Sequence, residues 1–135
     1  MRTRLITALP ALALAACQQQ PSTAPTKEPH IKVRSSEQDQ LHQLDAMNLA
    51  IALKRAIYDA GFGCKRITDA GFVGTYKNLD MWMAHCTYDQ GSPRDWAIFA
   101  GPDGSAQVRD CKDIPGTGLP ACEIRKRPNG KFGAA

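Results

Sequence analysis

Apolar residues recur at helical spacing from residue 41 to residue 58, and the polar residues between them fall on a narrow stripe. Such spacing predicts an amphipathic helix with one wide buried face. Ser36 fits the N-cap of this helix, and Gly61 fits the cap at its C-terminal end, where a positive φ is common. We therefore expect one long helix over residues 36–60. The apolar positions assigned to its buried face are Leu41, Leu44, Met47, Leu49, Ala50, Ile51, Leu53, Ile57 and Tyr58.

Beyond Gly63 the pattern changes to the alternation of period two that is typical of strands. The segments that fit are residues 64–68, 80–87, 94–100 and 105–110. Residues 101–104 read Gly-Pro-Asp-Gly, which favours a hairpin turn. The glycine-containing residues 69–79 are expected to form a loop, with the extension of a flanking strand through Phe72, Val73 and Tyr76 as the alternative. The predicted fold class is α+β: one long N-terminal helix packed on a three- to four-stranded antiparallel meander and stapled by disulfides.

The first 16 residues follow neither pattern. Arg2 and Arg4 precede an uncharged apolar run over residues 5–16. This run is too short to cross a bilayer as a helix, which needs about 20 residues, and it matches the apolar core of a secretory signal peptide. It ends in Leu14-Ala15-Ala16-Cys17, where small residues stand directly before a cysteine.

The basic start, the apolar run, the motif Leu14-Ala15-Ala16-Cys17 and its polar sequel together resemble the lipobox of bacterial lipoproteins. The resemblance implies that residues 1–16 are removed and that Cys17 carries the acyl chains. In that family an Asp after the cysteine favours the inner membrane, and here the residue is Gln18. The expected location is therefore the periplasmic face of the outer membrane, with the inner membrane as the alternative.

Composition changes along the remaining chain. Residues 17–35, rich in proline and glutamine, are expected to form the lipidated end and a flexible tether, since they cannot bury a core. Residues 36–124 are expected to form one small periplasmic domain, and residues 125–135 a basic, mobile tail. Loss of Arg2 and Arg4 would halve the formal net charge of +4, which is too weak and dispersed to indicate nucleic-acid binding.

Four of the five cysteines remain after lipidation, and four cysteines allow three pairings. Cys64 and Cys86 are centred on residue 75, so a hairpin folded there would place them opposite each other, while Cys111 and Cys122 would close a short loop. We favour the pairs Cys64–Cys86 and Cys111–Cys122; the alternative joins Cys64 or Cys86 to Cys111. No C-x-x-C spacing occurs, which favours disulfides over a metal site or a redox-active pair.

The sequence contains no G-x-S-x-G, H-E-x-x-H or P-loop motif, and we expect no cofactor and no bound metal. The candidate binding surface is Met81, Trp82, Met83, His85 and Trp96. In a strand Trp82 lies on the face opposite to Met81, Met83 and His85. One helix covers only one of these faces, so the other is open unless a second layer covers it. We favour a second layer formed by residues 70–79.

These features lead to two hypotheses of function. The first is a non-enzymatic, membrane-anchored periplasmic module that binds an envelope protein or cell-wall polymer, as a scaffold or an inhibitor. The second is a small-ligand-binding or enzymatic domain that uses the sheet face around Trp82, His85 and Trp96. We favour the first because no constellation of residues selects a reaction.

Overall fold

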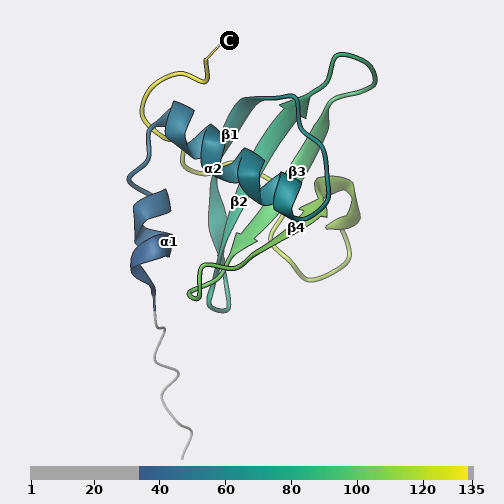
Figure 1. The fold of residues 1–135 in the computed structure, drawn as a ribbon. Helices are drawn as coiled ribbons and strands as arrows, with labels where there is room; N and C mark the ends of the chain where they lie inside the picture. The colour runs from purple at the N-terminus through teal and green to yellow at the C-terminus, as the bar shows by residue number, and fades with distance from the viewer. Residues whose placement is uncertain (1–33, 134–135) are drawn as a thin grey trace, which may run out of the picture. The chain divides into compact units, whose positions relative to one another are not determined.

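The computed structural model describes residues 34–133. The expected signal segment 1–16, the lipidation site Cys17 and almost all of the expected tether lie outside the described residues. Between residues 34 and 133, two helices are followed by a four-stranded antiparallel sheet, and two disulfides are present, so this part has an α+β fold (Figure 1). None of the helices in this part is long and apolar enough to cross a membrane.

The single helix predicted over residues 36–60 is wrong, because two helices occupy this region: α1, Ser36–Leu41, and α2, Ala46–Asp59. Asp45 has an extended backbone, and its side chain accepts a hydrogen bond from the backbone N–H of Asn48 at 2.8 Å. It is therefore the N-cap of a new helix rather than part of a polar stripe. Ser35 caps α1 in the same way, within a capping box closed by Gln38.

The sheet is a simple meander in the order β1-β2-β3-β4. Its strands are β1, Arg66–Tyr76, β2, Leu79–Thr87, β3, Arg94–Ala100, and β4, Ala106–Asp110, and a short 3-10 helix, η1, Cys111–Asp113, follows. The loop expected over residues 69–79 is mostly strand, since β1 runs to Tyr76. The reversal between β1 and β2 is confined to Lys77 and Asn78, and Lys77 has a φ of 55°.

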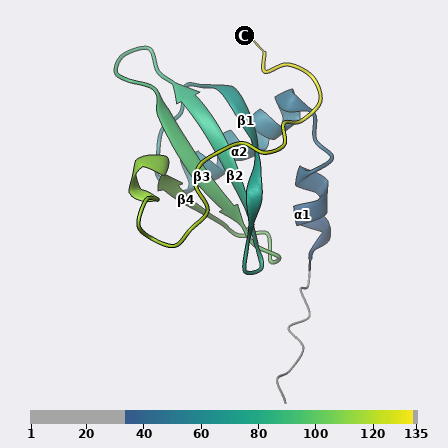
Figure 2. The same ribbon diagram turned by 180° about the vertical axis from the view of Figure 1, so that it is seen from behind.

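Both faces of the sheet are buried. Helix α2 lies across one face, over a core that includes Leu53, Trp82 and Ile98 (Figure 1). The chain after β4 runs behind the sheet (Figure 2). There Met81 and Phe99 form a second cluster with residues of the segment 111–122, which we call the cover segment. The sheet is therefore the middle layer of three.

Residues 125–127, at the start of the segment expected to be a mobile tail, are paired to β1. The backbone N–H of Phe72 donates to the carbonyl of Lys126 at 2.8 Å, and the two residues form an antiparallel bridge. Arg127 donates from Nε and Nη2 to the two carboxylate oxygens of Asp69, at 3.1 and 2.8 Å. This pairing protects the outer edge of β1. Residues 134–135 lie outside the described residues.

The two disulfides are Cys64–Cys86 and Cys111–Cys122, the pairs favoured from the sequence. The first joins the segment before β1 to β2, and both of its cysteines are buried in the core under α2. The second closes the cover segment on the opposite face of the sheet. Each disulfide therefore secures one of the two layers that enclose the sheet.

Candidate functional site

The structure divides the surface expected from Met81, Trp82, Met83, His85 and Trp96 between the two faces of the sheet. Trp82 and Trp96 are buried under α2, and Met81 is buried under the cover segment. A second layer is present, as favoured, but the cover segment provides most of it, and Val73 and Leu79 are the contributions from the expected residues 70–79. Around Trp82, His85 and Trp96 there is consequently no shared open face.

His85 is the most accessible polar member of this set. Its Nδ1 is hydrogen-bonded to a carboxylate oxygen of Asp95 on the neighbouring strand, and both side chains are partly exposed. Asp69 is the cross-strand partner of His85 on the other side. The pKa of Asp69 is lowered, mainly by its hydrogen bond with Arg127 and to a smaller extent by the charges of Arg127 and His85. Within residues 34–133, no group of three or more metal-ligating side chains is close enough to hold an ion.

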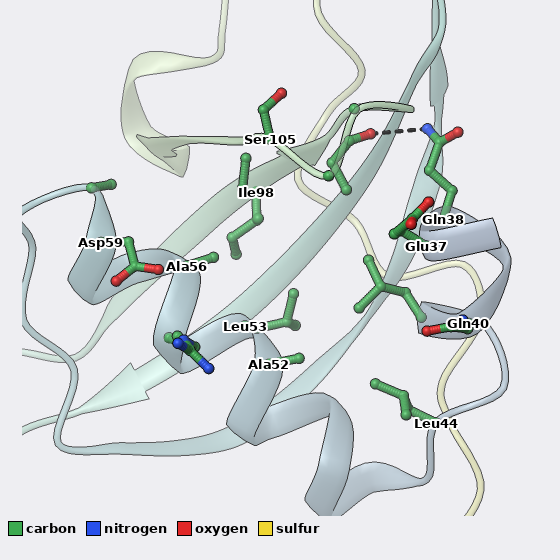
Figure 3. Close-up of a pocket in the computed structure, with 17 residues that line it drawn as sticks. Glu37, Gln38, Gln40, Leu44, Ala52, Leu53, Ala56, Asp59, Ile98 and Ser105 are labelled. Carbon is green, nitrogen blue, oxygen red and sulfur yellow. Dashed lines mark hydrogen bonds between the residues drawn. The ribbon is translucent and has the colours of Figure 1, made fainter. Parts of the chain in front are cut away.

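A groove of about 560 Å³ lies between α1, α2 and the end of the sheet (Figure 3). Its floor and walls include the apolar side chains of Leu41, Leu44, Leu53 and Ile98. Charged and polar residues, Glu37, Gln40, Arg55, Asp59 and Ser105, line its margins. A hollow of this size and character suits an apolar group of a ligand or peptide.

Small residues create this groove. Ala52, Ala56 and Ala60 are spaced by four positions, so they lie on one flank of α2 and at its end, and all three line the hollow. The turn between β3 and β4 contributes Gly101 and Gly104, and Gly104 has a φ of 77°. A larger side chain on the alanine flank would fill the space. The alanine spacing is therefore a signal in the sequence that our sequence analysis missed.

Gln38 holds the end wall of the groove in place. Its side chain is buried, and its Nε2 donates to the carbonyl of Asn78 at 2.9 Å. The same Nε2 donates to the carbonyl of Ala100 at 3.0 Å (Figure 3). These bonds join α1 to the β1–β2 turn and to the end of β3. Because one carbonyl belongs to β3 and the other to the turn between β1 and β2, α1 is fixed against the end of the sheet, and the groove is formed before any ligand arrives.

The groove carries charge of both signs at its margins, from Glu37, Arg55 and Asp59, and its described lining contains no histidine and no cysteine. The pKa of Glu37 is lowered, mainly by a hydrogen bond from its own backbone N–H and then by the hydroxyls of Ser35 and Ser36. Glu37 therefore stays ionised. The arrangement can bind an apolar group and orient it through Glu37, Arg55 and Asp59.

Comparison with known proteins adds no further constraint on this site: no family model, no curated protein and no solved structure matches the chain.

Proposed function

We propose that this chain is a lipid-anchored, non-enzymatic binding module of the bacterial envelope, held at the periplasmic face of the outer membrane. The motif Leu14-Ala15-Ala16-Cys17 supports the anchor, because it resembles a lipobox. Two disulfides within about 100 residues support an oxidising compartment. In this proposal Cys17 carries the lipid and the domain binds an apolar peptide segment of an envelope protein.

The groove is the observation that carries the binding part of the proposal. Its volume of about 560 Å³ falls within the range of 300–1,000 Å³ that is typical of ligand sites. Its apolar lining would bury side chains such as leucine or phenylalanine, and its fixed walls reduce the entropy lost on binding. The adjacent strand β4 stands at the edge of the sheet and would offer backbone groups to an extended peptide.

The anchor is tested by Cys17→Ser in the full-length chain. We expect the unsubstituted protein to fractionate with membranes and to incorporate a fatty-acid label, and the variant to lose both properties. Gln18→Asp is the matched control, since it keeps the cysteine and should keep the label while shifting the protein toward the inner membrane. Membrane fractionation and labelling that survive Cys17→Ser would contradict the proposed anchor.

The groove is tested by photo-crosslinking from residues inside and outside it. A photoreactive amino acid at Ala52 or Ala56 would face the groove, whereas the same probe at Lys112 would lie on an exposed part of η1. We expect a discrete crosslinked envelope protein from the two groove positions and none from Lys112, and we expect Ala56→Trp to abolish the product obtained from Ala52. Equal labelling from all three positions would contradict a binding role for the groove.

A further inference from the structure

The exposed large apolar side chains of the described residues gather in one place. They are Met47, Ile51, Tyr58 and Phe62, with exposed fractions of 60%, 60%, 53% and 40%. The first three belong to α2, and Phe62 follows it within three residues. The sequence pattern assigned Met47, Ile51 and Tyr58 to the buried face of a helix, and the structure places them on the solvent side.

The spacing of these residues explains their common orientation. Residues 47, 51 and 58 are separated by four and seven positions, so they form one stripe along α2. The buried residues Leu49, Leu53 and Ile57 form the opposite stripe. Helix α2 is thus apolar on two sides, and only one of them is covered by the sheet (Figure 1).

Basic residues flank the exposed stripe. At 100° per residue, Lys54 and Arg55 project on its two sides, and the single carboxylate of α2 is Asp59 at its last position. The Lys54 ammonium lies 6.0 Å from the centre of the Tyr58 ring and donates to the carbonyl of Lys65 at 2.7 Å. We call Met47, Ile51 and Tyr58, with Lys54 and Arg55, the outer face of α2.

We infer that the outer face of α2 docks on the surface of an anionic phospholipid bilayer. This inference rests on the proposed anchor, because the anchor brings the domain to the membrane. Helices that lie in a membrane interface combine an apolar stripe with flanking Lys and Arg, and tyrosine places its ring in the acyl boundary and its hydroxyl in the headgroup region. The outer face has each of these components.

Charge favours a lipid surface over a second copy of the chain. If two copies paired through the outer faces of α2, the interface would contain Lys54 and Arg55 of both helices, and this face contains no carboxylate to neutralise them. Anionic headgroups supply that negative charge, and each basic residue near such a surface adds attraction that salt weakens. The complementary partner for this face is therefore the lipid.

The chain between the anchor and the domain permits this contact. Residues 18–33 separate Cys17 from the first described residue, and 16 residues span at most about 56 Å when fully extended. A domain of about 100 residues has a radius of gyration of about 13 Å, so this length allows any of its faces to reach the bilayer. Tethering also raises the effective concentration of the bilayer at the domain, so a short stripe suffices.

The test uses the full lipidated protein reconstituted in vesicles of phosphatidylethanolamine and brominated phosphatidylglycerol. Ile51→Trp places a fluorophore in the outer face, and Lys112→Trp places the matched fluorophore at an exposed position on η1. The fluorescence of Trp82 and Trp96, measured in the unsubstituted protein, is subtracted first. We then expect bromine to quench the fluorescence of Ile51→Trp at least about twofold more than that of Lys112→Trp. Lys54→Glu combined with Arg55→Glu should remove this difference.

The possible results of this experiment test the proposed anchor and the proposed docking separately. If the protein does not sediment with the vesicles, the proposed anchor fails and the docking inference fails with it. If the protein sediments but residue 51 is quenched no more than residue 112, the anchor stands and the docking inference is overturned, which leaves the outer face to a protein partner. Greater quenching at residue 51 that is lost in neutral vesicles supports docking on anionic lipid.

Discussion

The guanidinium of Arg34 donates from Nη2 to a carboxylate oxygen of Asp80 at 2.9 Å, and so joins the first described residue to the interior of the domain. Asp80 is almost completely buried, with a side-chain exposure of 1%. The same carboxylate is hydrogen-bonded to Nε2 of His42 at 2.9 Å and accepts from the hydroxyl of Thr75 at 3.3 Å. His42, with a side-chain exposure of 22%, is thus partly buried beside Asp80. These contacts fix α1 to the sheet where the chain enters the domain.

Removing the Arg34 side chain should destabilise the domain. Arg34→Ala leaves a buried carboxylate with fewer partners, and we expect the free energy of unfolding to fall by about 2 kcal/mol. The expected loss of stability is limited to this value because the Arg34 side chain is 41% exposed, so water replaces part of its interaction with Asp80. Urea unfolding with the disulfides intact measures the change. Arg34→Lys, which keeps the charge but loses the fork of donors, should recover part of it; an unchanged midpoint in Arg34→Ala would contradict the expectation.

The helical region shows where the sequence pattern was ambiguous. The apolar spacing is continuous from residue 41 to residue 58, and it has the same period on both sides of the break between α1 and α2. The break is set by tertiary contacts that the pattern does not contain, such as the bond of His42 with Asp80. For the same reason the exposure of Met47 and Ile51 was missed, because period alone does not state which apolar side faces the sheet.

For the sheet, the sequence predicted the pair Cys64–Cys86 correctly and the extent of β1 incorrectly. The pair Cys64–Cys86 is centred on residue 75, whereas the turn is at residues 77–78. Two register shifts in β1, between Ile67 and Asp69 and between Phe72 and Gly74, move the partner of Cys86 toward Cys64, to Ile67, and interrupt the alternation that would have extended the predicted strand. The cysteine spacing still favoured the observed pair, although Cys64 lies before β1 and the residue opposite Cys86 is Ile67. The groove was missed because its signal in the sequence, the spacing of Ala52, Ala56 and Ala60, is a pattern of small side chains without polar or reactive groups.

Gly71 is the point at which the C-terminal segment approaches β1 most closely. A Cβ atom at this position would lie 2.5 Å from Cγ2 of Ile124 and 2.6 Å from the carbonyl oxygen of Lys126. We expect Gly71→Ala to push residues 124–127 away from the strand and to lower the free energy of unfolding by about 2 kcal/mol. Hydrogen exchange should be faster at the amide of Phe72, which donates to Lys126.

Gly74→Ala is the matched control for this effect. Gly74 lies in the same strand, and no heavy atom outside its chain neighbours is within 4 Å of the position its Cβ would take. We expect this variant to keep the protection of the Phe72 amide and to unfold within about 0.5 kcal/mol of the unsubstituted protein. Equal effects of the two substitutions would show that the C-terminal segment does not depend on the missing Cβ of Gly71.

The two disulfides should differ in their reactivity toward a reductant. Cys64 and Cys86 are buried in the core, whereas Cys111 and Cys122 are only partly buried at the surface of the cover segment. Because exchange requires access of the attacking thiolate, we expect a mild reductant to open Cys111–Cys122 first. Alkylation followed by peptide mass mapping measures the order.

Loss of the Cys111–Cys122 disulfide should lower the free energy of unfolding. The cysteines of this bond are 11 residues apart, and the chain-entropy estimate for such a loop is about 3 kcal/mol. The double variant Cys111→Ser with Cys122→Ser should show this loss in urea unfolding. In denaturant, both disulfides should be reduced at the same rate, which controls for their intrinsic reactivity. Reduction of Cys64–Cys86 as fast as Cys111–Cys122 in the folded protein would contradict the expected order.

Acid should weaken the contact between Asp69 and Arg127. The pKa of Asp69 is lowered from its ordinary value of 3.8, mainly by the hydrogen bond from Arg127. A carboxylate with a depressed pKa in the folded state contributes stability that is complete above its unfolded pKa and is lost as the pH falls through the folded value. The coupling between Asp69 and Arg127 should therefore be constant from pH 7 down to about pH 4 and should vanish below that. A double-mutant cycle with Asp69→Asn and Arg127→Gln, followed by urea unfolding from pH 7 to pH 2, measures this coupling. A coupling that persists after the Asp69 carboxylate is protonated would show that the charge of Asp69 is not its cause.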